Sequence, residues 1–455
     1  MARGHQRGVG AGTLAAFVGP CLPLAGFGLP LTIHLPTFYA RDLGLPLSAV
    51  GLAFLLVRLA DIGLDPALGA LMDRTRTRLG RFRPWLIASV PVLMTASALL
   101  FMARPGVGPA YLWAALVIGY AGFSMGSLSQ QAWAAALSPD YDGRSRVYGW
   151  WQAGNVLGML LILLTPAVVQ LGLHGGRVEG VRAMGWLLIL ALPVTVAVAC
   201  RLVPDPCPPP GRQRPAALGD YLGLLRRRSV ASLMAADLLL GWAPGITGAL
   251  FLFYFDQIKH VPDAQANLML LAYFVAALLG APLWSWLATR VGKHRALALN
   301  ALSIVASLAV VWLTPLASPL VGFPVMALAG LPYSGGSLLL RAMLADVGDE
   351  LRLETGADRT GLLYAVLTGT TKIGSALALL TFVILDALGF DAQAAHNSPA
   401  ALAGLQALFV GLPALLSAAA ALAIMTYPLD ARRHAEIRAA LEALDPAAPQ
   451  AAAAE

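Results

Sequence analysis

The sequence predicts an all-α membrane protein with twelve transmembrane helices in two six-helix, pseudo-symmetric bundles. Composition is the first reason: 58% of the 455 residues are hydrophobic, 12% are charged, and the mean hydropathy is +0.71. Soluble domains carry roughly 25% charged residues, so a soluble fold is excluded. The other reasons are twelve apolar runs of membrane-spanning length and one proline-rich segment at their midpoint.

The apolar runs are separated by Gly, Pro or clusters of charge, and a membrane helix needs about 20 such residues. In the first half the runs lie near 14–40, 48–72, 84–104, 108–138, 147–170 and 184–202. In the second half they lie near 229–256, 265–289, 294–314, 318–346, 360–388 and 400–427. Each run is therefore expected to form one transmembrane helix.

The longest internal polar segment, 203–228, divides the runs into six and six. It begins PDPCPPPGRQRP and continues with ALGDYLGLLRRRSV, a basic pattern that favours a short amphipathic helix. We predict an N-terminal bundle over 1–202, a central cytoplasmic loop over 203–228 and a C-terminal bundle over 229–427. Residues 428–455 are predicted to be a cytoplasmic tail with a short charged helix, ARRHAEIRAALEAL, followed by a disordered Ala/Pro segment.

The distribution of Lys and Arg predicts the orientation of the helices, because basic loops stay in the cytoplasm. With the N-terminus inside, most of the 31 Lys and Arg residues fall in cytoplasmic loops. The exceptions outside are Arg41, Arg104, Arg177, Arg182 and Lys259. Both termini are therefore predicted to be cytoplasmic, in a multi-pass protein of a bacterial inner membrane. This bias and the attraction to anionic lipid explain the net charge of +7, so a nucleic-acid partner is not required.

Three charged residues interrupt the second apolar run, within the stretch FLLVRLADIGLDPALGALM. Arg58, Asp61 and Asp65 have helical spacing, which puts them on one face. Ionisable groups inside a membrane are costly and mark ion or substrate paths. Two carboxylates one turn apart cannot both ionise cheaply there, so they are expected to share a proton or a small hard cation. A structural ion-pair network, with Arg58 as the counter-ion, is the alternative.

Longer motifs carry a family resemblance. DIGLDPALGALMDRTRTRLGRFRPW and ADVGDELRLETGADRTGLLYAVLTGTTKIGSALA, with the weaker ALSPDYDGRSRVYGWWQ, resemble segments of the glycoside/pentoside/hexuronide:cation symporters of the major facilitator superfamily. The resemblance implies the major facilitator fold and alternating access. It also implies cation-coupled symport of a small organic solute such as a glycoside, with no enzyme activity and no cofactor besides the coupling ion, H⁺ or Na⁺.

The resemblance assigns roles to individual residues. Asp61 and Asp65 match the carboxylates that bind the coupling cation, Lys372 matches a lysine near them, and Ser124 falls at a hydroxyl position. A possible Na⁺ would lie at the two carboxylates. Leu64 stands where the family pattern has an asparagine, which favours a proton. Gating or structural roles are predicted for Arg58, Asp73, Arg74, Arg81, Asp346 and Arg359.

The substrate site departs from the family pattern, because the two sugar-binding aspartates align near Ala25 and Ser127. Uncharged polar groups and flat aromatic faces could instead bind a neutral, polyhydroxylated substrate, although interfacial anchoring is the alternative for the tryptophans. Asp237 lies mid-run and faces either substrate or a structural partner. The predicted substrate residues are Gln131, Gln152, Asn155, Asp237, Trp133 and Trp151.

Other functions remain as alternatives. A cation-coupled transporter of an amphipathic or lysolipid-like substrate is compatible with the missing sugar carboxylates. An intramembrane enzyme is a distant alternative, because DxxxD resembles a prenyltransferase motif but DVGDE has different spacing. A pump driven by ATP is disfavoured, since the chain has no GxxxxGK[ST] motif. The expected partners are a small-molecule substrate and membrane lipid, with no obligate protein partner.

Overall fold

The structure is a computed structural model that describes residues 10–75, 77–137, 141–205, 223–355, 360–425, 427–429 and 431–444. Twelve helical segments in these ranges are long and apolar enough to cross a membrane. The twelve predicted spans are therefore confirmed. Their bounds differ from the predicted runs mostly by a few residues, since helices extend into polar ends that hydropathy alone does not detect.

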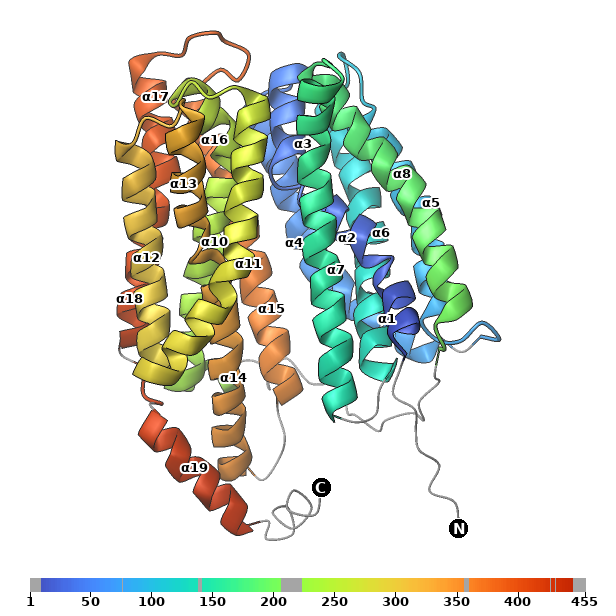
Figure 1. The fold of residues 1–455 in the computed structure, drawn as a ribbon, viewed down its shortest axis with the longest axis vertical. Coiled ribbons are helices and arrows are strands. Elements are labelled where there is room, and N and C mark those ends of the chain that lie inside the picture. Colours follow the sequence, from blue (N-terminus) through green and yellow to red (C-terminus); the bar gives the residue numbers. More distant parts are fainter. Residues whose placement is uncertain are drawn as a thin grey trace. The chain divides into compact units, whose positions relative to one another are not determined.

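The first six spans follow in chain order (Figure 1). They comprise α1 (Ala11–Val18), α2 (Cys21–Gly28), α3 (His34–Thr37) and η1 (Phe38–Asp42); α4 (Leu47–Arg74); α5 (Arg83–Phe101); α6 (Pro109–Leu137); α7 (Tyr141–Ala167) with η2 (Val168–Gly172); and α8 (Arg177–Leu202). The amphipathic helix predicted within 203–228 falls largely on 206–222, which lie outside the described residues.

The last six spans complete the described membrane helices. They comprise α10 (Arg228–Gln257); α11 (Asp263–Val291); α12 (Lys293–Leu313); α13 (Pro319–Gly330) with α14 (Tyr333–Thr355); α15 (Thr360–Leu377) with α16 (Leu380–Ala387); and α17 (Pro399–Gln406), η3 (Ala407–Gly411) and α18 (Leu412–Met425). The charged helix expected in the tail is present as α19 (Ala431–Leu444).

Prolines and π-helical turns interrupt several of these spans. The first span is divided into α1, α2, α3 and the π-helical η1, in a stretch that contains Pro20, Pro23, Pro30 and Pro36. Proline lacks an N–H and its ring clashes with the preceding turn, so this division has a local cause. The segments η2 and η3 are further π-helical turns inside the fifth and twelfth spans.

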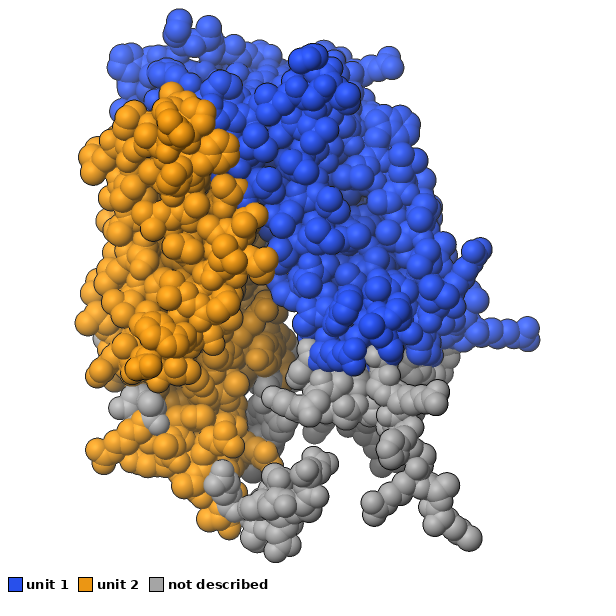
Figure 2. All heavy atoms as spheres, in the orientation of Figure 1, with its two compact units in different colours: residues 1–212, 248–271, 379–405 blue, residues 213–247, 272–378, 406–455 orange. Residues whose placement is uncertain are grey.

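The chain forms two compact units (Figure 2). The first unit comprises residues 1–212, 248–271 and 379–405, and the second comprises 213–247, 272–378 and 406–455. Segments from the second half of the sequence thus belong to the first unit. The division into two consecutive six-helix bundles stays a prediction.

Small residues let helices approach closely inside the first unit. A Cβ on Gly154 would lie 2.2 Å from Val18 Cγ1, and one on Gly158 would lie 2.3 Å from the carbonyl oxygen of Leu22. This Gly-x-x-x-Gly spacing on α7 brings it against α1 and α2, as small residues commonly do in membrane helices. The core of this unit also contains fully buried aromatic side chains, among them Phe17, Phe27, Phe54, Phe101 and Trp133.

Large apolar side chains cover much of the helical surface. Leu190 on α8 is 63% exposed, and Leu313 at the end of α12 is 73% exposed. A water-soluble monomer rarely exposes many such groups together, whereas lipid tails solvate them. This surface agrees with helices that face a bilayer.

Candidate functional site

The predicted carboxylate pair lies on α4 of the first unit. Asp61 and Asp65 are four residues apart, so their side chains occupy the same helix face one turn apart. Pro66 follows directly inside the helix and lacks the N–H that would bond the carbonyl oxygen of Ile62. The Ile62 carbonyl oxygen therefore lacks this intrahelical donor.

Asp61 is buried, with 7% of its surface exposed, and it accepts a hydrogen bond from a second helix. The donor is the Ser124 hydroxyl on α6, whose Oγ lies 2.7 Å from Asp61 Oδ1. Ser124 itself is 2% exposed. The structure thus brings together two of the predicted cation-site residues, Asp61 and Ser124, from α4 and α6.

The other two predicted cation-site residues have different surroundings. Asp65 is partly buried on the same helix as Asp61. Lys372 lies on α15 of the second unit and is also partly buried. Since the carboxylates belong to the first unit, the predicted role of Lys372 beside them stays a prediction.

The hydrogen bonds of Arg58 correct its expected role as a counter-ion. Its Nε donates to the Tyr120 hydroxyl at 2.8 Å, and its Nη2 donates to Thr32 Oγ1 at 2.9 Å. Both acceptors are neutral oxygens of the first unit. The guanidinium therefore joins α4 to the first span and to α6, instead of pairing with Asp61 or Asp65.

Three predicted substrate residues cluster on α7. Gln152 is exposed, and the partly buried Asn155 donates from its Nδ2 to the Trp151 carbonyl oxygen at 2.9 Å. Trp151 is partly buried and makes an edge contact with Tyr148, with ring centroids 6.4 Å apart. Gln131 on α6 is exposed as well. These polar and aromatic groups are therefore accessible within the first unit.

Trp133 is a core residue instead of the predicted substrate platform. Its side chain is 0% exposed, and its Nε1 donates to the Pro204 carbonyl oxygen at 2.8 Å. Phe17 packs edge-on against the ring at 5.9 Å between centroids, and the Arg83 guanidinium lies 5.9 Å from the ring centroid. A ring enclosed in this way has no face left for a ligand.

Asp237 lies on α10 in the second unit and is 6% exposed. It accepts hydrogen bonds from two consecutive threonines of α15: Thr370 Oγ1 at 2.5 Å and Thr371 Oγ1 at 2.9 Å from its Oδ2. Of the two roles left open for Asp237, these contacts favour the structural partner. The carboxylate joins α10 to α15.

The predicted gating residues are described only in part. Asp73 and Arg74 end α4, but their side chains lie outside the described part of the chain, as does all of Arg359. The Arg81 guanidinium lies 5.1 Å from the centroid of the Phe82 ring. Asp346 forms an ion pair with Lys293, with 2.6 Å between Oδ1 and Nζ. Roles in gating stay predictions for all of them.

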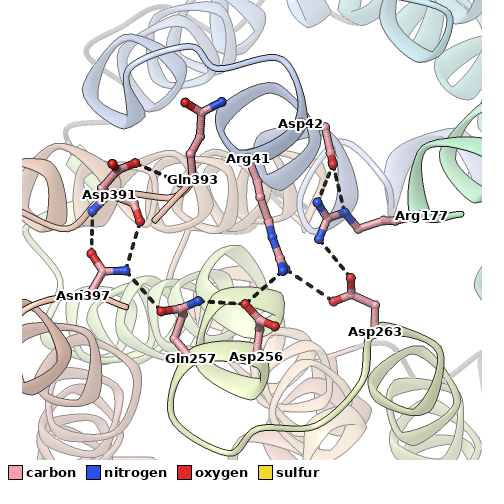
Figure 3. A network of polar contacts seen from close by, with 9 residues as sticks. All are labelled: Arg41, Asp42, Arg177, Asp256, Gln257, Asp263, Asp391, Gln393 and Asn397. Atoms are coloured by element: carbon pink, nitrogen blue, oxygen red, sulfur yellow. Dashed lines mark hydrogen bonds and ion pairs between the residues drawn. The ribbon is translucent and has the colours of Figure 1, made fainter. Parts of the chain in front are cut away.

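A polar network not predicted from the sequence lies at one end of the first unit (Figure 3). Arg41 on η1 is 3.1 Å from Asp256 and 3.6 Å from Asp263, measured between Nη and Oδ atoms. Arg177, at the start of α8, pairs with Asp42 and with Asp263, the latter at 3.0 Å. These side chains are only partly exposed, so their ion pairs contribute more than isolated surface pairs do.

Neutral side chains extend this network to the loop between α16 and α17. Gln257 donates to Asp256 at 2.9 Å and accepts from Asn397 Nδ2 at 3.1 Å. Asn397 in turn accepts from the Asp391 backbone N–H at 2.7 Å, and the Gln393 N–H donates to the Asp391 carboxylate at 2.8 Å. We call these nine residues of Figure 3 the outer network. It joins segments 248–271 and 379–405 to the rest of the first unit.

Sequence reasoning missed the outer network because its partners are far apart in the chain. In the sequence, most of six helices lies between Arg41 and Asp256, so no short-range spacing relates the two residues. One signal was available: few Lys and Arg fall on the side predicted to be external, yet Arg41 and Arg177 each lie at the end of a span. Arg41 and Arg177 thus depart from the positive-inside bias, which marked them as residues to examine for carboxylate partners.

Comparisons with known proteins agree with this architecture. A family model described as MFS/sugar transport protein matches residues 17–431. The isoprimeverose transporter of Lactiplantibacillus pentosus is 23% identical over 414 residues, which cover 88% of this chain and 85% of that protein. The inner membrane symporter YicJ of Escherichia coli (strain K12) is 25% identical over 403 residues, 84% of each chain.

A solved structure of the nucleoside transporter NupG has the same fold. Its TM-score to this chain is 0.65 at 13% identity, over 92% of this chain and 100% of that chain. At this level of identity the likeness concerns the fold alone. The relatives are transporters and symporters similar to the glycoside/pentoside/hexuronide:cation symporters, so the chain is a transporter and not an enzyme. Its twelve spans make it a multi-pass protein of the plasma membrane. The family match shows that the chain belongs to the MFS/sugar transport protein family.

Proposed function

We propose that this transporter is a symporter that couples the uptake of a neutral, sugar-like solute to the inward movement of a cation. One observation carries the proposal: the buried Asp61 accepts a hydrogen bond from Ser124, with a second carboxylate, Asp65, one turn away on the same helix. The arrangement gathers oxygen atoms and negative charge in an apolar environment.

The energy of this arrangement depends on what occupies it. Two carboxylates about 5–6 Å apart at their Cβ atoms repel each other strongly when both are ionised in a low-dielectric interior. A proton or a small cation removes that repulsion. Occupancy thereby changes the free energy of one helix arrangement relative to another, which is the requirement for coupling.

The proton is the coupling ion that the residues favour. Leu64 places an apolar side chain directly before Asp65, where an amide would add an oxygen ligand. A proton needs a single carboxylate oxygen, whereas an alkali cation needs several oxygens around it. The Ser124 hydroxyl contacts Asp61, and the Ile62 carbonyl oxygen one residue along the helix lacks its usual donor, so Na⁺ is the second candidate.

The outer network supports alternating access as the mechanism. Its ion pairs join η1 and α8 to the ends of α10 and α11, all at one end of the first unit. Exposing a substrate site to that side requires these segments to separate. The pairs between Arg41 and Asp256 and between Arg177 and Asp263 would then break and re-form once in each cycle.

The sugar-like substrate is proposed from the named relative and from α7. One relative is named as a transporter of isoprimeverose, and α7 of this chain presents Trp151, Gln152 and Asn155. An aromatic ring beside amide groups suits a sugar, whose ring has apolar faces and polar edges. We therefore expect isoprimeverose or another small neutral glycoside to be a substrate.

Transport into proteoliposomes tests the proposal. Labelled isoprimeverose and a panel of neutral disaccharides would be offered under an inside-alkaline pH gradient without Na⁺, and separately under a Na⁺ gradient at clamped pH. We expect accumulation driven by the pH gradient. Asp61→Asn should abolish this accumulation. Asp386→Asn serves as the control for that loss of a carboxylate, since Asp386 accepts a hydrogen bond from the Ser48 N–H and an amide oxygen can also accept it.

The outcomes separate the parts of the proposal. Accumulation with the Na⁺ gradient alone would identify Na⁺ as the coupling ion and contradict the preference for the proton. Uptake of a lysophospholipid with no uptake of any sugar would overturn the substrate class. Downhill uptake that neither gradient can drive to accumulation would contradict symport altogether.

A further inference from the structure

The second unit contains a polar cavity of about 440 Å³ that the transport cycle proposed above does not use. It lies where α11 passes into α12 and where the chain enters α19. Small-molecule pockets in proteins have volumes of roughly 300–1,000 Å³, so a compact organic ligand would fit. The sequence predicts that this end of the helices faces the cytoplasm.

Positive charge dominates the lining of the cavity. Four lining side chains are cationic at neutral pH, two are histidines, and Asp346 is the one carboxylate among them. The cations are Arg290, Lys293, Arg295 and Arg432, and the histidines are His294 and His434. An excess of charge of one sign in a concave site raises the local concentration of ions of the opposite charge.

Only part of this charge is neutralised. Lys293 forms the ion pair with Asp346, and the exposed Arg432 lies 3.3 Å from Glu436. Among the described residues, Arg290 and Arg295 form no ion pair. The Arg290 guanidinium lies 5.5 Å from the centroid of the Trp286 ring, which leaves its N–H groups available to an anion.

Both walls of the cavity are held by well-defined contacts. Gly292 has a φ of +90°, which glycine adopts at little cost, and it permits the tight turn from α11 into the basic start of α12. On the other side α19 packs against α14 (Figure 1). Ile437 is buried in the hydrophobic core of this unit, and His434 lies 3.1 Å from Asp349. The helices that carry the cationic groups are thus held in place before any ligand arrives.

We propose that this cavity is a binding site for a phosphate-bearing anion. Guanidinium groups form paired, charge-assisted hydrogen bonds with phosphate oxygens, which suits Arg290 and Arg295. Because Arg295 begins α12 and Arg432 lies on α19, a bound phosphate would join the two walls and stabilise this end of the unit. The phosphate could belong to a free phosphorylated molecule or to the headgroup of an anionic lipid.

The surroundings make the lipid headgroup a realistic source of the phosphate. Trp286 is 53% exposed one turn before Arg290, and tryptophan is enriched at the membrane–water interface. The cavity would then open at the depth of lipid headgroups. A soluble ligand would reach the same arginines from the aqueous side, so the chemistry is shared and only the source differs.

Two measurements on the full-length purified protein test the site. In neutral detergent, inorganic pyrophosphate would be titrated by calorimetry at low and high ionic strength. In parallel, the protein would be placed in nanodiscs of phosphatidylcholine alone or with added phosphatidylglycerol, and its thermal unfolding would be compared. We expect pyrophosphate binding that weakens with salt, or stabilisation that requires the anionic lipid.

Variants assign the effect to the cavity. Arg295→Gln is matched by Arg352→Gln, an exposed arginine of α14 outside the lining, and Arg432→Gln is matched by its neighbour Arg433→Gln. Each cavity variant should weaken binding about tenfold, as expected for the loss of one charge-assisted contact, while the matched variants change it less than twofold.

The results decide both the site and the source. Binding of pyrophosphate that is lost in the cavity variants supports a soluble ligand, and lipid stabilisation lost in the same variants supports a headgroup. Arg432 lies on an exposed helix, so Arg432→Gln remains interpretable if Arg295→Gln does not fold. Absence of both effects in the unmodified protein, or equal losses in matched and cavity variants, would overturn the proposal.

Discussion

Asp61 in the first unit and Asp237 in the second are both buried carboxylates on described membrane helices, but their neighbours differ. Asp61 shares its helix face with a second carboxylate, and the Ser124 hydroxyl donates a hydrogen bond to it. On the helix of Asp237, the residues three and four positions away in either direction are apolar or glycine, so no second carboxylate shares its helix face. Asp237 accepts hydrogen bonds from the hydroxyls of Thr370 and Thr371.

We propose that this difference separates a site that can change its charge from one that holds two helices together. Around Asp61, the proposed function has the repulsion of Asp65 make the state of the pair depend on a bound proton or cation. Around Asp237, two hydroxyl donors satisfy a single carboxylate, and each hydroxyl is also within hydrogen-bond distance of the Leu367 carbonyl oxygen. Burial alone therefore does not identify a coupling residue.

The largest expected effect comes from Asp61→Asn. Removing the charge should abolish gradient-driven accumulation but leave downhill exchange of substrate intact. Moving one charge through 100 mV is worth about 2.3 kcal/mol, so accumulation at that potential should fall by about 50-fold. Proteoliposome uptake measures it. Asp237→Asn, the matched change in the second unit, should accumulate substrate to the same ratio as the unmodified protein. Equal losses in both variants would show that the two carboxylates do not differ in this way.

A second test removes the partners of Asp237. The double substitution Thr370→Val and Thr371→Val leaves a buried carboxylate without its donors, which should destabilise the protein by about 3 kcal/mol. Thermal unfolding in detergent measures the change, and adding Asp237→Leu should recover part of it. Thr368→Val is the control, because that hydroxyl is exposed and bonds within its own helix. Unchanged unfolding of the double variant would show that Asp237 does not hold α10 to α15.

Ser124→Ala should have a smaller effect than either change above. It removes one hydrogen bond to Asp61 but keeps both carboxylates, so the initial uptake rate should fall about tenfold while accumulation is retained. Ser129→Ala on the same helix is the matched control, since its buried hydroxyl bonds to the Gly126 carbonyl oxygen and should change the rate little. Loss of accumulation in Ser124→Ala would mean that the hydroxyl itself is required for coupling.

The smallest expected effect belongs to Tyr120→Phe, which removes one of the two neutral acceptors of Arg58. We expect a destabilisation of about 1 kcal/mol with unchanged coupling, because Thr32 still accepts from the guanidinium. Thermal unfolding and proteoliposome accumulation would be measured together. A Tyr120→Phe variant that folds normally but no longer accumulates substrate would support the hypothesis that Arg58 is a counter-ion of the carboxylates.

The spans were predictable from the sequence because each one is a long apolar run bounded by charge, Gly or Pro. The charged tail helix α19 was predictable as well, since ARRHAEIRAALEAL has strong helix formers and no proline. The pairing of Asp61 with a hydroxyl on α6 was expected from the resemblance, and Ser124 provides it.

The partners of individual side chains were not predictable in the same way. Membrane helices are apolar on all sides, so hydropathy could not tell that Trp133 faces the core or that Trp186 is 56% exposed. The pairs of Arg41 with Asp256 and of Asp237 with Thr370 join distant segments, and no local spacing records such contacts. Arg58 shows the converse, since helical spacing suggested an aspartate partner but neutral oxygens were closer.

The π-helical turn η1 gives the first span one residue more than a regular α-helix would hold, and both Arg41 and Asp42 lie within it. If that surplus residue moved along the helix, the side chains it passes would rotate by about 100° and advance about 1.5 Å while the backbone stayed hydrogen-bonded. Arg41 would then swing away from Asp256 and Asp263. A local change of helical register, rather than the unfolding of a helix end, could in this way release the ion pairs.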